Sequence, residues 1–179
     1  MPASLPLLSA GRPALVRLAW EAIREQVEGR NPQVLLAALP RLSPPQACFV
    51  SLKKKGRLRG CIGTLVPTQP HLEAEIVANA IASSQRDPRF PPVTWRELGH
   101  LAVSLDLLSA PEPVALPADL DPRLYGVIVS SAGRSGVLLP DLPGVDTVAR
   151  QIAICRDKAD IPPDAPITLQ RFTVQRLGE

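Results

Sequence analysis

The stretch ACFVSLKKKGRLRGCIGTL, residues 47–65, decides the fold because it has the pattern of a β-hairpin. Residues 47–52 and 58–65 have the composition of strands, and a lysine-rich run with one glycine separates them. A three-residue loop, Lys54-Lys55-Gly56, with a left-handed glycine is a common hairpin closure. The register that follows has three pairs: Lys53 with Arg57, Ser51 with Arg59, and Phe49 with Cys61.

The two faces of this hairpin follow from the register, because side chains alternate across a strand. One face carries the polar and reactive groups, which are Arg57, Arg59, Cys61, Ser51 and Lys53. The other face is expected to point into the core, and it carries Val50, Leu52, Leu58 and Ile62. A slip of one residue would move Cys61 relative to Cys48.

Outward from the hairpin, helical spacing of apolar residues predicts helices over 13–29 and 70–86, and a third helix capped by Asp146 that runs to about residue 159. Further strands are predicted over 101–108, 125–130, 136–139 and 167–177. This mixture lacks a regular βαβ alternation, so it favours an α+β fold with a mostly antiparallel sheet. The length of 179 residues fits a single domain, residues 1–179, with room for a smaller lobe.

Composition excludes several classes of protein. Hydrophobic residues make up 45% and charged residues 21%, which fits neither a disordered chain nor a membrane protein. The net charge of +3 is mild, and only residues 53–59 form a basic run, so nucleic-acid binding is not favoured. The first residues lack the pattern of a signal peptide, and three widely spaced cysteines do not indicate a disulfide framework. A cytoplasmic location is therefore expected.

Cys61 and Arg59 are the candidate catalytic residues. A thiol acts in chemistry as the thiolate, and a nearby guanidinium stabilises that charge. The bare glycines at positions 60 and 63 would let a ligand approach the backbone closely. The alternative is that Cys61 is a small buried hydrophobe of the sheet.

Four further residues are candidates for binding a substrate. The stiff loop after the second predicted helix holds a carboxylate and a guanidinium, Asp87 and Arg89, although both could instead cap neighbouring backbone. Asn79 lies on the apolar side of that helix, where its amide requires partners. Asp141 belongs to a second proline-rich acidic turn, which could also be a simple connector.

No metal or cofactor is expected from the residues. His71 and His100 stand alone, and no cysteine or histidine pair has the spacing of metal ligands. Phosphate loops and dinucleotide-binding patterns are absent from the sequence. A Cys–His pair remains open, because either histidine could approach Cys61 in space.

Several motifs occur in the order typical of one family. They are LRGCIG at 58–63, preceded by FVSL at 49–52; NA at 79–80; DPRF at 87–90; YGVIV at 125–129; LLPD at 138–141; and GVDTV at 144–148 with KA at 158–159. This set resembles the AMMECR domain family, and in particular its prokaryotic branch, called AmmeMemoRadiSam system protein A. The resemblance covers about residues 15–174. It departs from the family at Ser83-Ser84, where alanines are common.

The resemblance implies an α+β fold with a sheet flanked by helices and a smaller lobe. It also implies genomic association with a Memo-type protein and a radical SAM protein, but it implies no established reaction. Three hypotheses remain: an accessory binding component for those partners, an enzyme that uses Cys61 as nucleophile or redox thiol on a small anionic substrate, and a nucleic-acid-binding module through residues 53–59.

Overall fold

The computed structural model describes residues 12–39 and 42–178. Helices and strands follow one another there in the order α1 (Arg12–Val27), α2 (Val34–Ala37), β1 (Cys48–Lys54), β2 (Arg57–Gly63), α3 (Leu72–Gln85), the 3-10 helix η1 (Trp95–His100), β3 (Leu101–Leu108), β4 (Glu112–Val114), the 3-10 helix η2 (Pro117–Asp119), β5 (Gly126–Ser131), β6 (Arg134–Leu138), α4 (Val148–Lys158), β7 (Thr168–Phe172) and β8 (Val174–Gly178). The described chain divides into two compact units, one of residues 12–39, 42–107 and 175–178 and one of residues 108–174.

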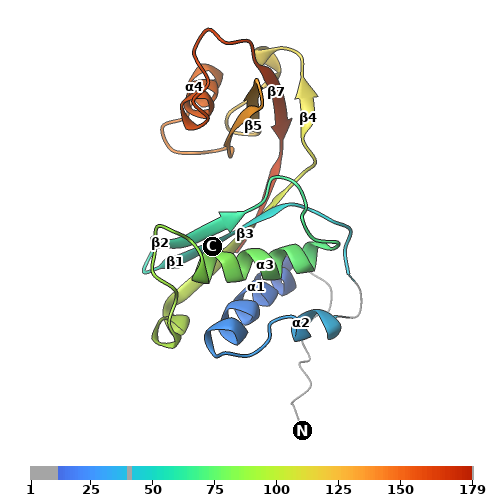
Figure 1. Cartoon of the computed structure of the whole chain (residues 1–179), viewed down its shortest axis with the longest axis vertical. Coiled ribbons are helices and arrows are strands. Elements are labelled where there is room, and N and C mark those ends of the chain that lie inside the picture. Colours follow the sequence, from blue (N-terminus) through green and yellow to red (C-terminus); the bar gives the residue numbers. More distant parts are fainter. Residues whose placement is uncertain (1–11, 40–41, 179) are drawn as a thin grey trace. The chain divides into compact units, whose positions relative to one another are not determined.

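The first unit is built on a four-stranded sheet with the order β2-β1-β3-β8, in which β1 is antiparallel to β2 and β3. Helices α1 and α3 pack against each other and cover one face of this sheet (Figure 1). The buried residues between them include Leu18 and Ile76 of the helices and Val50, Leu52 and Leu105 of the strands. The alternate apolar positions of β1 and β3 therefore determine which face the helices cover. The helices predicted over 13–29 and 70–86 are confirmed as α1 and α3.

The predicted register of the β1–β2 hairpin is wrong. Ser51 pairs with Cys61 and Lys54 with Arg57, and a β-bulge between Leu52 and Lys53 shifts the register. The loop has two residues, because Lys55 (φ 51°) and Gly56 (φ 75°) both adopt the left-handed conformation. Such a turn matches the twist of paired strands, and the bulge accommodates one extra residue, Arg59, in β2.

The bulge also changes which side chains face the core. Leu58 now lies opposite Lys53 and is 45% exposed, so its predicted place in the core is wrong. Gly60 faces α3 instead, where a Cβ atom would lie 2.2 Å from the carbonyl oxygen of Ser83. Cys61 lies on the opposite face from Gly60, next to Ser51. Opposite Leu52, the helix-covered face thus has Gly60 where the expected register had Leu58.

The second unit contains a four-stranded sheet with the order β4-β7-β5-β6, whose neighbouring pairs β4–β7, β7–β5 and β5–β6 are antiparallel. Helix α4 packs against β5 and β6 (Figure 1). The predicted helix cap is corrected: Thr147, not Asp146, is the N-cap, and its side chain accepts a hydrogen bond from the Arg150 N–H over 3.2 Å. The hydroxyl of a Thr at this position satisfies an N–H that has no partner within the helix.

The single strand predicted over 167–177 is also corrected, since β7 and β8 belong to different sheets. Between them, Thr173 donates its N–H to Ser109 Oγ and accepts a hydrogen bond from the Ser109 N–H, both over 3.0 Å. The N–H and the carbonyl of Thr173 are thus both bonded to Ser109, so neither continues the hydrogen-bond ladder of a single sheet. Two mostly antiparallel sheets with helices confirm the α+β fold class. Over residues 12–39 and 42–178, none of the helices has the length and apolar character needed to span a bilayer.

Candidate functional site

Strand β2, which carries Arg59 and Cys61, lies at the edge of the first sheet. An edge strand presents backbone groups that no neighbouring strand pairs. At Cys61 the loop after α3 satisfies them: the Cys61 N–H donates to Asp87 Oδ2 over 2.9 Å, and the Cys61 carbonyl accepts from Arg89 Nη2 over 3.0 Å. Asp87 and Arg89 thus take the place of a further strand at this residue.

Asp87 and Arg89 also bind each other. Arg89 Nε donates to Asp87 Oδ1 over 2.9 Å, and Arg89 Nη2 donates to Asp87 Oδ2 over 2.7 Å. The carboxylate is only 3% exposed. Hydrogen bonds from Arg89 hold the pKa of Asp87 well below its usual range despite the opposing effect of burial, and the Cys61 N–H contributes in the same direction. The loop is therefore an anchored carboxylate–guanidinium pair rather than a free one.

Replacing Asp87 by alanine is expected to expose the Cys61 amide to hydrogen exchange at least about tenfold faster, because the N–H loses its acceptor at the sheet edge. Amide exchange followed by NMR measures this directly. The matched control is S51A, which removes the side-chain partner of Cys61 but leaves its N–H bonded to Asp87. Equal protection of the Cys61 amide in D87A and the wild type would contradict the proposed role of Asp87.

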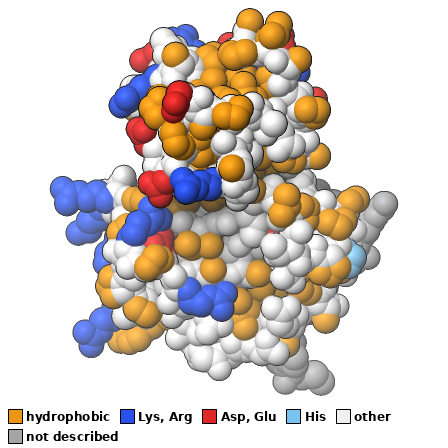
Figure 2. All heavy atoms as spheres, turned by 45° about the horizontal axis from the view of Figure 1, so that its top comes forward, with side chains coloured by type: hydrophobic (Ala, Val, Ile, Leu, Met, Phe, Trp, Pro, Cys, Tyr) orange, Lys and Arg blue, Asp and Glu red, His pale blue; other side chains and the backbone are white. Residues whose placement is uncertain are grey.

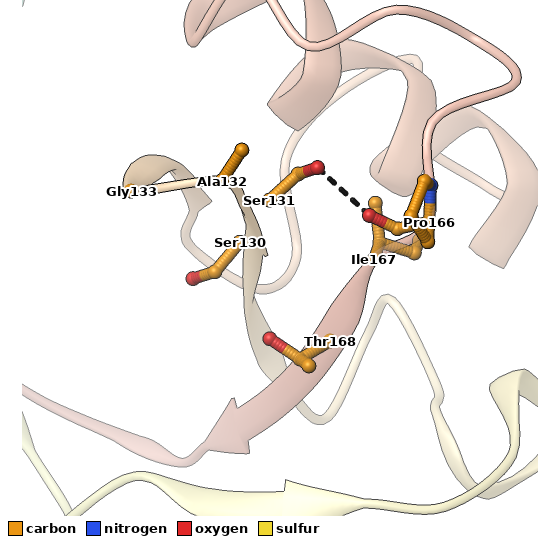
Figure 3. A pocket seen from close by; sticks show the side chains of 7 residues that line it. All are labelled: Ser130, Ser131, Ala132, Gly133, Pro166, Ile167 and Thr168. Carbon is orange, nitrogen blue, oxygen red and sulfur yellow. Dashed lines mark hydrogen bonds between the residues drawn. The ribbon is translucent and has the colours of Figure 1, made fainter.

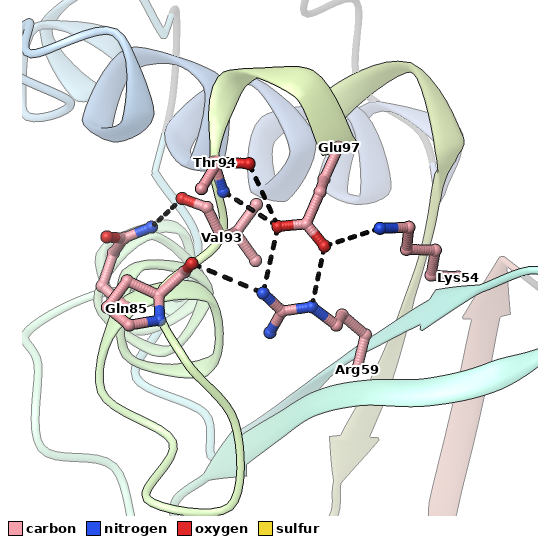
Figure 4. Close-up of polar contacts among 7 residues, drawn as sticks. Lys54, Arg59, Gln85, Val93, Thr94 and Glu97 are labelled. Atoms are coloured by element: carbon pink, nitrogen blue, oxygen red, sulfur yellow. Dashed lines mark hydrogen bonds and ion pairs between the residues drawn. The ribbon is translucent and has the colours of Figure 1, made fainter.

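The Arg59 guanidinium is paired with a carboxylate. Its guanidinium binds Glu97 of η1 through Nε to Oε1 over 3.0 Å and Nη2 to Oε2 over 3.1 Å (Figure 4). Lys54 Nζ reaches the same carboxylate over 2.9 Å. The expected pairing of Arg59 with Ser51 is corrected, because Arg59 is the extra residue of the bulge and its side chain binds Glu97 of η1.

Glu97 is the centre of this cluster. Thr94 contributes its backbone N–H to Oε2 over 3.1 Å, which also caps η1. The hydrogen bonds from Arg59 and then from Lys54 and Thr94 lower the pKa of Glu97 from 4.5 to about 2, although burial opposes the shift. The cluster fastens η1 to the β1–β2 hairpin.

The low pKa of Glu97 makes stability depend on pH. Since the folded pKa of about 2 lies below the unfolded value of 4.5, the carboxylate stabilises the fold above pH 4.5, and this contribution is lost as the pH falls through about 2. The variant E97Q is expected to lose about 2 kcal/mol of unfolding free energy at pH 7. Its difference from the wild type should shrink below pH 4.5, as measured by urea unfolding.

The control for this prediction is K54M. Lys54 is 37% exposed, so its ion pair with Glu97 is partly screened by solvent and its removal is expected to cost less than about 1 kcal/mol. A difference between E97Q and the wild type that stayed constant from pH 7 to pH 3 would refute the linkage.

Cys61 itself is partly exposed. The Ser51 hydroxyl donates to its Sγ over 3.2 Å, and the register places Ser104 of β3 on the far side of Ser51. Within the described residues, neither His71 nor His100 forms a hydrogen bond with the Cys61 thiol. In the described part of the chain, the Cys61 thiol has the Ser51 hydroxyl as its hydrogen-bond partner, and the pKa of Arg89 is raised first by Asp87 and also by the interaction of its guanidinium with this thiol.

The remaining two candidates lie elsewhere. Asn79 is 5% exposed, and its Nδ2 donates to the Cys48 carbonyl over 3.0 Å. Asp141 lies in the second unit on an exposed turn with φ 54°, where its N–H donates to the Pro122 carbonyl over 2.8 Å. The structure therefore brings together Cys61, Asp87 and Arg89, while Asn79 takes part in positioning β1.

Sequence reasoning missed Glu97 and the fully buried Glu75. Glu75 accepts hydrogen bonds from Thr64 Oγ1 over 2.6 Å, from the Thr68 N–H over 2.8 Å and from the Gln69 N–H over 2.8 Å. Its signal in the sequence is an acid beside Ile76 and four residues before Asn79, on the side of the helix expected to be apolar. Glu97 follows Thr94 by three residues, which is the spacing of a capping box.

A metal site is not formed by the described residues: no three of their His, Cys, Asp or Glu side chains come together in a manner that could hold an ion. A pocket of about 410 Å³ lies in the second unit between the β5–β6 turn and the start of β7 (Figure 3). It is lined by Ser130, Ser131, Ala132, Gly133, Pro166, Ile167 and Thr168. Hydroxyls are its only side-chain polar groups, and Ser131 Oγ already donates to the Pro166 carbonyl over 2.8 Å. This lining offers neither an acid nor a base for catalysis.

The protein is thus a two-sheet α+β protein whose edge strand carries the sequence LRGCIG and is bound by Asp87 and Arg89. The AMMECR1 family model matches residues 16–177, and the chain belongs to that family.

Three similar proteins extend this assignment. A protein of Thermotoga maritima is 54% identical over 130 residues, which are 72% of this chain and 75% of its own length. Protein CA_C1420 of Clostridium acetobutylicum is 47% identical over 131 residues, which are 73% of this chain but only 28% of that protein. The crystal structure of the uncharacterized protein PH0010 from Pyrococcus horikoshii is similar with a TM-score of 0.79 at 32% identity, covering 90% of this chain and 88% of that one.

Proposed function

We propose that this AMMECR1-family protein is an accessory binding component that works with a Memo-type protein and a radical SAM protein in the cytoplasm. The observation that carries the proposal is that three charged residues of the family motifs, Arg59, Asp87 and Arg89, are paired within the chain. Arg59 binds Glu97, and Arg89 binds Asp87 and the Cys61 carbonyl. These groups build a rigid surface element, and no His, Asp or Glu side chain in the described part of the chain forms a hydrogen bond with the Cys61 thiol.

Rigidity of this kind suits a binding surface. A bidentate pair with little exposure, such as Arg59 with Glu97, holds its two elements in one geometry. A surface that is already ordered loses less conformational entropy when a partner binds. The free thiols of Cys48, Cys61 and Cys155 agree with the reducing compartment that the proposal requires.

The length of one relative gives independent support. The region similar to this chain makes up 28% of Protein CA_C1420, so in that protein an AMMECR1-type region is joined to a much longer polypeptide. An AMMECR1-type region that is joined to further sequence in one protein is well suited, as a separate chain, to act together with other proteins.

Co-purification tests the proposal. The tagged protein is mixed at micromolar concentration with the Memo-type and radical SAM proteins encoded in the same genome, and complexes are measured by size-exclusion chromatography and surface plasmon resonance. The expected result is a complex with at least one of the two. The absence of any complex with either protein, alone or together, would overturn the proposal.

An enzyme that uses Cys61 is the second candidate, and one observation favours it: the thiol is partly exposed and lies 3.2 Å from the Ser51 hydroxyl. Iodoacetamide alkylation at pH 7, with mass spectrometry to assign the site, distinguishes the two functions. Alkylation of Cys61 at least about tenfold faster than that of glutathione would support a reactive thiol, since reactivity follows the thiolate population. An equal or slower rate would count against the enzyme.

A further inference from the structure

We infer that the tip of the β1–β2 hairpin and the start of η1 form a docking surface for an acidic polypeptide segment that carries a large apolar side chain. This basic hairpin surface consists of Lys53, Lys55, Arg57, Leu58, Trp95 and Arg96. The inference rests on the proposed function as a binding component, and it names the chemistry of the segment that the partner contributes.

The cations at the hairpin tip are available to a partner. Lys53, Lys55 and Arg57 are all exposed, and no ion pair or side-chain hydrogen bond joins them to another residue in the described part of the chain. Their neighbours Lys54 and Arg59 differ, because both bind Glu97. The tip therefore carries three positive charges within five residues that the chain itself does not neutralise.

Exposed large apolar side chains lie on the hairpin itself and at the start of η1. Trp95 is 68% exposed and Leu58 is 45% exposed, and Leu58 pairs across the hairpin with Lys53. The guanidinium of Arg96 lies 5.3 Å from the centroid of the Trp95 ring. Exposed Trp and Arg are the residue types that most often contribute the binding energy of protein interfaces. Figure 2 shows Lys and Arg side chains projecting at the left margin of the lower part of that view, with hydrophobic side chains among them.

The two parts of the surface are held in place before any partner binds. Glu97, two residues after Trp95, binds Lys54 over 2.9 Å and Arg59 over 3.0 Å, so η1 is fastened to the hairpin (Figure 4). The two-residue turn at Lys55 and Gly56 fixes the shape of the tip. The surface is thus ordered, which reduces the entropy lost on binding.

An acidic polypeptide fits this surface better than a nucleic acid does. A nucleic acid would use the cations, but recognition of its backbone usually involves a longer basic face. It would also leave Leu58 exposed, since neither phosphate nor sugar gains from contact with an aliphatic side chain. A peptide with carboxylates and one large apolar side chain satisfies the charges, Leu58 and Trp95 together.

The experiment selects the ligand from a phage-displayed library of random dodecapeptides on the whole protein, with counter-selection against the variant K53E/K55E/R57E. The expected result is enrichment of peptides rich in Asp and Glu that contain at least one Trp, Phe, Leu or Ile. The most enriched peptide is then synthesised with a fluorescent label, and its binding is measured by fluorescence anisotropy.

Matched variants make the result specific. K53E/K55E/R57E and W95A are each expected to weaken binding of the peptide at least about tenfold. The control R17E/R123E/R150E makes the same change of charge at three arginines that are exposed elsewhere on the chain, and it is expected to weaken binding less than about twofold. An oligo-dT of twelve nucleotides serves as the nucleic-acid probe.

Three outcomes would overturn the inference: no enrichment, enriched peptides without acidic residues, or tighter binding of oligo-dT than of the peptide. Equal effects of K53E/K55E/R57E and R17E/R123E/R150E would also overturn it, because the attraction would then follow net charge alone. The co-purification experiment repeated with K53E/K55E/R57E separates this inference from the proposed function. If the partners bind this variant as well as the wild type, the docking surface is wrong while the accessory function stands; if they do not bind the wild type, the accessory function fails on its own.

Discussion

Replacement of Glu75 by alanine is expected to lower the unfolding free energy of the first unit by about 3 to 5 kcal/mol. The side chain is fully buried in α3 and accepts hydrogen bonds from Thr64 Oγ1 and from the N–H groups of Thr68 and Gln69. Without the carboxylate these donors would be left unsatisfied in the segment between β2 and α3, and a cavity would remain. The loss would therefore combine several unmade hydrogen bonds with lost packing.

Tryptophan fluorescence in urea measures this change selectively, because both tryptophans of the sequence, Trp20 and Trp95, lie in the first unit. E75Q keeps the volume and one acceptor oxygen, so it is expected to lose roughly half as much as E75A. E28A is the exposed control within the same unit: the Glu28 side chain is 36% exposed, and its loss is expected to cost less than about 1 kcal/mol. A loss below about 1 kcal/mol in E75A would contradict the role of Glu75 as the anchor of this segment.

Replacement of Gly60 by alanine is expected to destabilise the first unit by about 3 kcal/mol. A Cβ atom at this position would lie 2.2 Å from the carbonyl oxygen of Ser83 and 3.4 Å from Leu52 Cδ1. A backbone carbonyl within a helix cannot turn aside as a flexible side chain can, so α3 would have to move away from β2. The glycine in LRGCIG is thus required for close packing of the edge strand against α3.

The control for this prediction is G99A, since a Cβ atom at Gly99 would have no neighbour within 4 Å. Its effect on stability is expected to lie within about 0.5 kcal/mol. Urea unfolding of both variants, again followed by tryptophan fluorescence, provides the comparison. If G60A and G99A were equally stable, close packing at Gly60 would not limit the approach of α3.

The sequence pattern was sufficient for most secondary structure of the first unit. Apolar residues at helical spacing predicted α1 and α3, and alternation predicted β3, because periodicity is a local property of the chain. The single strand predicted over 167–177 was wrong, since the hydrogen bonds at Thr173, between β7 and β8, come from Ser109, which is 64 residues away. Its apolar residues alone gave no sign of that interruption.

The candidate site shows the same difference between local and distant effects. The sequence offered Cys61 as a candidate catalytic residue and Asp87 and Arg89 as candidate binding residues, and the structure brings these three together. The sequence could not predict that Arg59 binds Glu97, which is 38 residues away. It also paired Arg59 with Ser51, because a lysine in the left-handed conformation at position 55 and a bulge in β2 are not evident from residue types.

The sequence by itself thus determined the family, the fold class and the hairpin that carries LRGCIG, because composition, periodicity and motif order are properties of the chain. Only the tertiary structure decided which face of that hairpin each side chain occupies and which charges remain free. One extra residue in β2 turns Leu58 outward and directs Arg59 to η1, and a carboxylate on η1 then neutralises Arg59 while leaving Lys53, Lys55 and Arg57 exposed. Such an outcome depends on contacts between distant segments, whose energies no local pattern contains.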